Sequence, residues 1–419
     1  MKKIAAVKWS PLVRGLALIL VMGVWAMGIM GCVSGMSRLP AVELSAEAPY
    51  TKGTPFYEMT FHTTSMPGLL GGRAFVDAKT SLRSHPAPPG GEAAKAYHMV
   101  PAGMKLGEYL PLLPPAPVAA ASPSSSEPAE AQKAELESFT IKIYWGCGPT
   151  VGRNQPRVLD LAKLGKGHDI EKLMAMARAT GTQLPSGVTG QLKPGWAQAL
   201  WPNTQHSPTV STNSSLVGEH MLHGNFVPHM RFTMTTAHDI MPALDISTST
   251  SDVQQAITLS WNRLPTALGY QACAFAFNQA KREMILWISG QDPNTNVSGQ
   301  FLSSAEVRRQ IRKKNILPAD QLQCVIPAGI FAGSDVVMAT VTAWGSDYWA
   351  GYPEKPKNAP KGWKPDWTVQ GRFMSSGMIM LGMPGAAQAI PLPSAEDVVK
   401  EAGKEAGKGL LSNILGGIF

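Results

Sequence analysis

Alternating hydrophobic and polar positions recur along most of the 419-residue chain. At 56–62 the apolar residues Tyr57, Met59 and Phe61 are separated by polar ones. Successive side chains of a strand point to opposite faces, so this period of two predicts a half-buried strand. The same argument predicts strands at 139–145, 226–234, 284–288, 336–344 and 373–381, and two more within 256–277.

Three segments instead show helical spacing. Residues 303–314 begin with Ser303 and Glu306 in capping-box spacing, and 169–180 form a short amphipathic pattern. At 396–419 apolar residues recur every three or four positions, with lysines on another face and several interspersed glycines. This tail is interpreted either as a helix for a membrane surface or a partner, or as a tail that docks on its own domain.

These patterns predict a mainly β protein with two antiparallel β-sandwich-like domains, short helices and an amphipathic C-terminal helix. The first domain is expected at 48–245 and the second at 246–388, followed by the tail at 389–419. Residues 113–135 are rich in Pro, Ala and Ser without apolar periodicity, which indicates a low-complexity excursion from the first domain.

The N-terminus differs from the rest of the chain. Residues 1–14 carry four basic residues and no acid, and 15–31 are uncharged and mostly apolar. Seventeen residues are slightly short for a membrane-spanning helix, which needs roughly 20, and they suit the apolar core of a signal peptide. An uncleaved membrane anchor is the alternative interpretation.

The end of that apolar run, Ile29-Met30-Gly31-Cys32, resembles the lipobox of bacterial lipoproteins. The resemblance implies a signal peptide at 1–31, acylation of Cys32 and a tether at 32–47, so the expected partner is membrane lipid through the acylated Cys32. Val33, which is not Asp, implies an outer-membrane anchor whose periplasmic or surface side stays open.

Cleavage would change the charge of the chain. Removal of 1–31 takes away four basic residues and no acidic one, which lowers the formal net charge from +8 to +4. No dense Lys/Arg stripe then remains to neutralise phosphates, so a nucleic-acid partner is not expected.

Three cysteines besides Cys32 would enter an oxidising compartment, where disulfides form. They are Cys147, Cys273 and Cys324. We expect Cys273 and Cys324 to pair because both lie in the second predicted domain; three buried reduced cysteines are the alternative.

Two internal segments carry further resemblances. Residues 256–277, with Trp261 and Tyr270, are similar to the B–C strand region of fibronectin type III and related immunoglobulin-like sandwiches, which implies a fold only. The run Tyr144–Gly148, followed by 155–161, is similar to a segment of proteobacterial envelope lipoproteins and implies no particular activity.

Candidate chemistry is sparse. The spacing of Gly146, Gly148 and Gly152 fits neither a dinucleotide fingerprint nor a P-loop, and there is no G-x-S-x-G elbow, so no cofactor and no catalytic residue are predicted. His220 and His223, near several methionines, are weak candidates for copper ligands.

The best candidate for a binding surface is an aromatic and lysine-rich segment. Its aromatic residues are Trp344, Tyr348, Trp349, Tyr352, Trp363 and Trp367. The alternative interpretation of this segment is a long, Pro-rich loop whose aromatic rings cover the open end of a sandwich. For the whole chain, the leading hypothesis is a non-catalytic, lipid-anchored envelope protein that binds or scaffolds an envelope protein or a glycan. The alternatives are a lipid-anchored hydrolase acting on envelope polymers and a periplasmic copper-binding protein.

Overall fold

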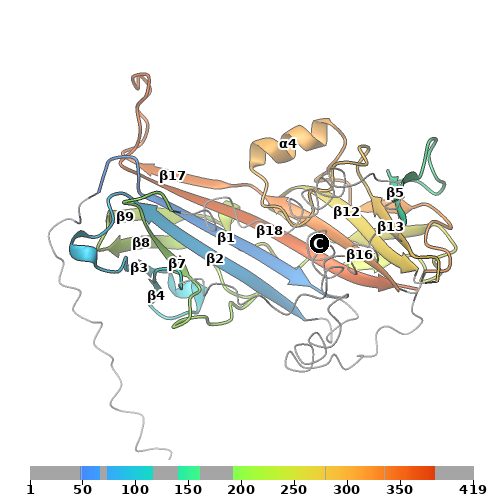
Figure 1. Ribbon diagram of the computed structural model, residues 1–419, viewed down its shortest axis with the longest axis horizontal. Helices are drawn as coiled ribbons and strands as arrows, with labels where there is room; N and C mark the ends of the chain where they lie inside the picture. The colour runs from blue at the N-terminus through green and yellow to red at the C-terminus, as the bar shows by residue number, and fades with distance from the viewer. Residues whose placement is uncertain are drawn as a thin grey trace, which may run out of the picture. The chain divides into compact units, whose positions relative to one another are not determined.

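An eleven-stranded sheet is the framework of the protein (Figure 1). Its main path runs in the order β6 (Arg157–Asp160), β5 (Thr140–Trp145), β13 (Glu283–Ile288), β12 (Ala267–Asn278), β16 (Val336–Gly345), β18 (Trp367–Leu381), β1 (Phe56–Ser65), β2 (Ala74–Ser84) and β7 (Ala197–Trp201). Two short strands lie off this path: β14 (Leu317–Pro318) pairs with β12, and β17 (Tyr348–Tyr352) pairs with β18.

Two smaller sheets complete the β structure. One has the order β4 (Tyr109–Leu112), β3 (Ala96–Met99), β8 (Gly218–Gly224) and β9 (Val227–Met234). The other has the order β10 (Ile246–Thr248), β11 (Ile257–Trp261) and β15 (Gln323–Ile326). Three 3-10 turns, η1 (Pro89–Gly91), η2 (Ala102–Met104) and η3 (Thr236–His238), and the helix α4 (Ser304–Arg312) are the helical elements of the described residues.

The computed structural model describes residue 48 and residues 50–66, 73–116, 140–160, 192–278, 280–334 and 336–382. The expected signal peptide at 1–31, Cys32, the tether, the helix at 169–180 and the tail at 389–419 lie outside these residues, as does most of the excursion at 113–135. Leu113, at the start of that excursion, forms a bridge with Leu200. No helix within the described ranges has the length and apolar character needed to span a membrane.

The predicted fold class is confirmed: the protein is mainly β, and among the described strands all pairings except β1–β18 and β13–β5 are antiparallel. The predicted strand at 56–62 corresponds to β1, and those at 284–288, 336–344 and 373–381 to β13, β16 and β18. The predicted helix at 303–314 corresponds to α4, whose N-cap Ser303 accepts a hydrogen bond from the Glu306 backbone N–H.

Each smaller sheet packs against a different part of the large one. Tyr57 of β1 contacts His98 of β3 and Phe232 of β9, with ring centroids 5.2 and 6.4 Å apart. Trp261 of β11 contacts Tyr270 of β12 at 5.6 Å. The large sheet therefore forms one sandwich-like arrangement with the four-stranded sheet and another with the three-stranded sheet. A sheet with a hydrophobic face must bury that face against another element.

The shared sheet crosses the position between residues 245 and 246 at which the sequence predicts a domain boundary. β1, before that position, and β18, after it, pair in parallel over ten residues of β1 (Figure 1). The described residues from Ala48 onward belong to one compact unit.

Gly377 of β18 marks a close approach between the large and the three-stranded sheet. A Cβ at this position would overlap the Leu244 carbonyl oxygen and lie 2.8 Å from side-chain carbons of Ile246 in β10. Only the absence of a side chain lets the two layers approach this closely.

Candidate functional site

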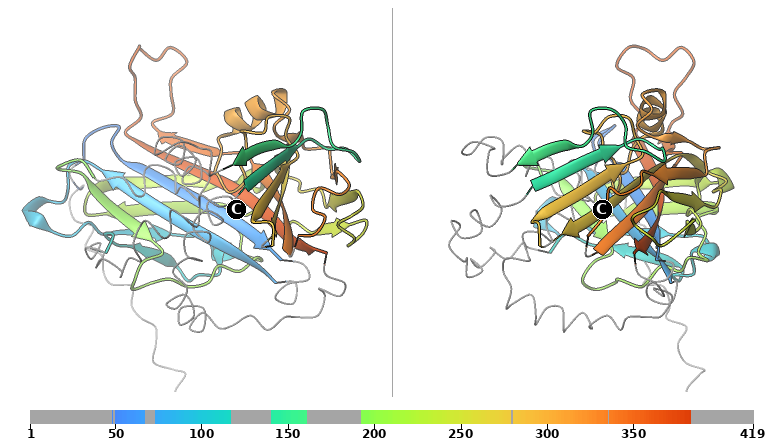
Figure 2. Two further views of the ribbon diagram at one scale, coloured as in Figure 1. Left: turned by 45° about the vertical axis from the view of Figure 1, so that its right-hand side comes forward. Right: turned by 90° about the vertical axis from the view of Figure 1, so that its right-hand side faces the viewer.

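The strand β17 is placed at a free edge of the large sheet. β16 pairs with residues 374–381 of β18, and β17 pairs with residues 367–371, so the two strands share the same side of β18 in succession. Among the described strands, β17 pairs with β18 alone. The connection from β17 to β18 projects from the sheet as a long, Pro- and Lys-rich hairpin (Figure 2).

A cavity of about 830 Å³ lies between β17, the start of β18, the projecting hairpin and β9. Its lining is mostly aromatic and aliphatic, with few charged groups. The lining residues are Arg231, Phe232, Thr233, Tyr348, Trp349, Ala350, Gly351, Tyr352, Pro353, Glu354, Lys355, Trp363, Pro365, Trp367 and Thr368. We call this site the β17 groove.

Five of the six aromatic residues singled out from the sequence line the β17 groove: Tyr348, Trp349, Tyr352, Trp363 and Trp367. Trp349 and Tyr352 are 56% and 60% exposed, which is high for such large side chains. Tyr352 stacks on Trp367 with ring centroids 6.0 Å apart. Exposed aromatic rings beside a concave surface are typical of binding sites.

Trp344 is not part of this surface, and its inclusion among the binding residues is wrong. It is 1% exposed and packs with Val307 of α4 and Met374 of β18. Its indole N–H donates a hydrogen bond to the Gln300 carbonyl at 2.7 Å. Trp344 lies near the end of β16, and the packing of α4 against this face of the sheet buries its ring.

The floor of the groove comes from β9, which the sequence does not link to this segment. Phe232 lies 6.0 Å from Tyr348 between ring centroids, and the Tyr348 hydroxyl donates a hydrogen bond to the Thr233 carbonyl at 3.0 Å. Because 115 residues separate Thr233 from Tyr348, only the tertiary structure brings them together.

Positive charge gathers around the groove. Lys355, Lys357, Lys361 and Lys364 are all exposed on the projecting hairpin, and within the described part of the chain none of them forms an ion pair. By contrast, Asp366 at the hairpin's end is paired with Lys52 at 2.9 Å. Unpaired surface charges of one sign attract a ligand of the other sign.

His220 and His223 do not form a metal site. They are three residues apart on β8 and lie on opposite faces, as the strand period requires. His220 is buried against His98, whereas His223 stacks on Tyr97. Within the described ranges, no group of three or more His, Cys, Asp or Glu residues is arranged to hold a metal ion.

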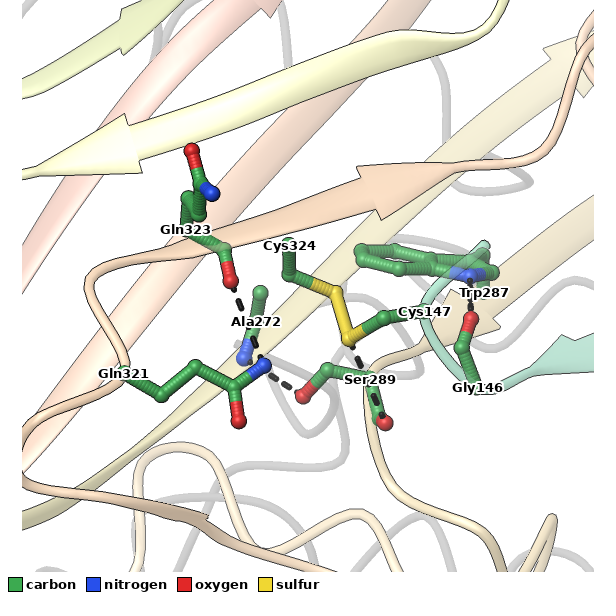
Figure 3. Close-up of a disulfide and its surroundings, with 8 residues drawn as sticks. All are labelled: Gly146, Cys147, Ala272, Trp287, Ser289, Gln321, Gln323 and Cys324. Atoms are coloured by element: carbon green, nitrogen blue, oxygen red, sulfur yellow. Dashed lines mark hydrogen bonds between the residues drawn. A yellow bond between two sulfur atoms is a disulfide. The ribbon is translucent and has the colours of Figure 1, made fainter. Parts of the chain in front are cut away.

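The expected disulfide between Cys273 and Cys324 is wrong: Cys324 is bonded to Cys147, with Cα atoms 5.3 Å apart (Figure 3). β5 runs parallel to β13, and after its end the Gly148 N–H donates to the Val325 carbonyl at 2.9 Å, which brings Cys147 to β15. Ala272 and Ala274 of β12 belong to the same core cluster as Cys324. Cys273, between them, points to the other face, where it is buried and accepts a hydrogen bond from Ser298.

One pair of side chains resembles part of a hydrolase site. His62 Nε2 lies 2.9 Å from Ser376 Oγ, and burial lowers the pKa of His62 to about 4, so the ring is neutral at pH 7 but a weaker base than an ordinary histidine. However, Ser376 is 6% exposed, and its hydroxyl also contacts Thr342 at 3.2 Å. Asp77 of β2 lies opposite His62 but forms an ion pair with Lys79. Among the described residues, no hydrogen bond joins Asp77 to His62.

No protein-family model matches this chain, and no curated protein matches it. Among solved structures, it is similar to the yeast delta-COP-I mu-homology domain in complex with a Dsl1 WxWxV peptide, at 9% identity over 78% of this chain and 97% of that chain, with a TM-score of 0.18. A structure of the same yeast domain alone matches with the same identity, coverage and TM-score.

Proposed function

We propose that this chain is a non-catalytic, lipid-anchored binding protein of the cell envelope and that the β17 groove is its ligand site. The observation that carries the proposal is the gathering of five aromatic side chains around a cavity of about 830 Å³ at a free strand edge. A concave, mostly apolar surface with a few polar groups is the usual form of a binding site.

Two observations support the envelope location. The motif Ile29–Cys32 follows an uncharged apolar run, and acylation of Cys32 there would give durable anchoring. The Cys147–Cys324 disulfide suits an oxidising compartment such as the periplasm or the cell surface. Together they favour export of the chain over a cytosolic role.

Photo-crosslinking tests the groove in living cells. Benzoylphenylalanine at Trp349 places a crosslinker at the rim, and the same residue at Phe75, which is 43% exposed on β2, is the matched control. We expect a specific crosslinked species from position 349 and none of the same mass from position 75. Equal products from both positions, or none from 349, would refute the proposed site.

The anchor has its own test. In cells given labelled palmitate, the native chain should be labelled and remain with the membrane fraction, and the Cys32→Ser variant should lose both properties. Retention of label by the variant would refute acylation at Cys32.

The hydrolase alternative has one observation in its favour, the contact between His62 and Ser376. A fluorophosphonate probe reports an activated serine directly, because it labels only a serine whose hydroxyl is made nucleophilic. Labelling of the native chain that disappears in Ser376→Ala would favour the hydrolase. We expect no labelling, because Ser376 is buried and Asp77, the carboxylate opposite His62, is paired with Lys79.

A further inference from the structure

We propose that the β17 groove binds an extended, acidic polypeptide segment, which adds a strand to the free edge of β17. This inference rests on the proposed binding function and names the chemical class of its ligand. It is carried by the backbone geometry of the groove, the chemistry of its lining and its charge.

The backbone of β17 presents hydrogen-bonding groups to the groove. The Asp366 N–H donates to the Tyr352 carbonyl at 2.6 Å, so the backbone N–H and C=O of Tyr352 point toward β18. In an antiparallel strand the N–H and C=O of one residue point to the same side, and neighbouring residues point to opposite sides. The backbone groups of Trp349 and Gly351 therefore point away from β18, along the free edge.

The opposite side of the groove is also a strand edge. β9 is the terminal strand of its sheet, and the Thr233 carbonyl accepts a hydrogen bond from the Tyr348 hydroxyl instead of from a neighbouring strand. By the same alternation, the backbone of Arg231 faces the groove. Two strand edges thus border one cavity, and unpaired edges are templates for another extended chain.

The lining favours a polypeptide over a sugar. The lining holds no amide side chain, and its hydroxyl and carboxylate groups are those of Thr233, Tyr348, Tyr352, Glu354 and Thr368. The Tyr348 hydroxyl is already bonded to Thr233. Apolar rings next to free backbone groups suit a strand, whose alternate side chains enter pockets while its backbone pairs.

The dimensions agree with a short strand. The five residues of β17 extend over about 17 Å at the usual rise of a β-strand. A partner segment of similar length would lie along this edge and place two or three side chains against Tyr352, Trp363 and Trp367.

The positive charge of the groove and its hairpin favours an acidic partner. Arg231 and Lys355 line the groove together with one acidic residue, Glu354, and Lys357, Lys361 and Lys364 are exposed on the hairpin that borders it. Arg231 lies 3.7 Å from Glu219, but both side chains are exposed, so Glu219 neutralises the charge of Arg231 only weakly. Acidic side chains in the bound segment would be attracted to these groups.

A proline at the edge tests the inference. The full chain, purified in detergent, selects binders from a displayed library of random dodecapeptides, and the affinity of enriched peptides is measured by fluorescence anisotropy. Gly351→Pro removes an outward N–H that the β17–β18 ladder does not use, and Gly351→Ala is the matched control, because both add a Cβ that meets Pro365 at 3.2 Å. Trp349→Pro removes the other outward N–H of β17, and Trp349→Ala, which keeps that N–H, is its control.

We expect enriched peptides to be acidic with alternate apolar residues, and to bind each proline variant at least tenfold more weakly than its alanine control. Lys355→Glu with Lys357→Glu should weaken them by a similar factor. Equal affinity for both proline variants and their controls, or enriched peptides without excess acidic residues, would overturn the inference. If the library yielded no binders while crosslinking at Trp349 still captured a ligand, the assignment of the ligand as a peptide would be overturned. The proposed binding function would then still hold.

Discussion

The Nε2 atom of His98 lies 2.9 Å from the Nδ1 atom of His220, inside the core between β3 and β8. His220 Nε2 is 2.7 Å from the Leu216 carbonyl, which can only accept, so this nitrogen carries the proton and Nδ1 accepts from His98. His98 Nδ1 must then accept from the Tyr57 hydroxyl at 2.8 Å. Both rings are neutral, and every proton in the chain of hydrogen bonds has a partner.

The buried histidine pair predicts acid sensitivity. Burial lowers the pKa of both His98 and His220 below the ordinary value of 6.5. As the pH falls through 6.5, these two rings take up protons more readily in the unfolded chain than in the folded one, so the stabilisation is full above pH 6.5 and decreases below it. The free energy of unfolding in urea should fall by up to about 1.4 kcal/mol per pH unit for each of the two histidines.

Two variants separate this pair from other titrating groups. The double variant His98→Gln, His220→Gln should be less stable at pH 7.5, because Tyr57 and Leu216 lose well-matched partners, and its stability should depend less on pH between 7.5 and 5.5. Ser247→Ala, on the exposed face of β10, changes no titratable group and should keep the native pH dependence. An unchanged slope in the double variant would contradict the assignment.

The disulfide predicts a specific peptide map. Digestion without reduction should yield Cys147 linked to Cys324, with Cys273 recovered as a free thiol that reacts only after unfolding, since burial raises the pKa of its thiol to about 11. A peptide linking Cys273 to Cys324 would contradict the structure.

Loss of the disulfide should also lower stability. The bond joins residues 177 positions apart, and removal of a native disulfide typically costs about 2–5 kcal/mol. We expect a decrease of this size in the free energy of unfolding for Cys147→Ser with Cys324→Ser. Cys273→Ala, which removes the free thiol, is the control and should cost less.

The two tryptophans Trp344 and Trp349 should respond differently to truncation. Trp344→Ala removes a fully buried ring and should lower the free energy of unfolding by about 3–5 kcal/mol. Trp349→Ala removes a ring that is 56% exposed and should leave the urea midpoint nearly unchanged while it weakens ligand binding. Equal destabilisation by both variants would mean that the β17 groove is part of the core.

Local patterning was enough to predict the strands β1, β13 and β16, because a period of two in hydrophobicity depends only on which face is buried. The helix α4 was predictable from Ser303 and Glu306 for a similar reason, since the cap lies within one turn. These features need no knowledge of distant residues.

Long-range relationships were not predictable from such patterns. The sequence separates Cys147 from Cys324 by an expected domain boundary, and the parallel pairing of β5 with β13 and the hydrogen bond from Gly148 to Val325 bring them together. In the candidate site, the aromatic segment was recognisable from its composition. The contribution of Thr233 and the burial of Trp344 against α4 depend on tertiary packing.

Gly377→Ala tests how closely the large sheet approaches the three-stranded one. A Cβ there would overlap the Leu244 carbonyl, and backbone cannot move aside as a flexible side chain can, so we expect a loss of about 1–3 kcal/mol in the free energy of unfolding. Gly148→Ala is the control, because its Cβ would meet no atom closer than 3.8 Å, and it should stay within about 0.5 kcal/mol of the native chain. Urea unfolding at pH 7.5 measures both. If the two variants were equally stable, β18 would not pack directly on Leu244, and the layers that share the sheet would be further apart than the structure places them.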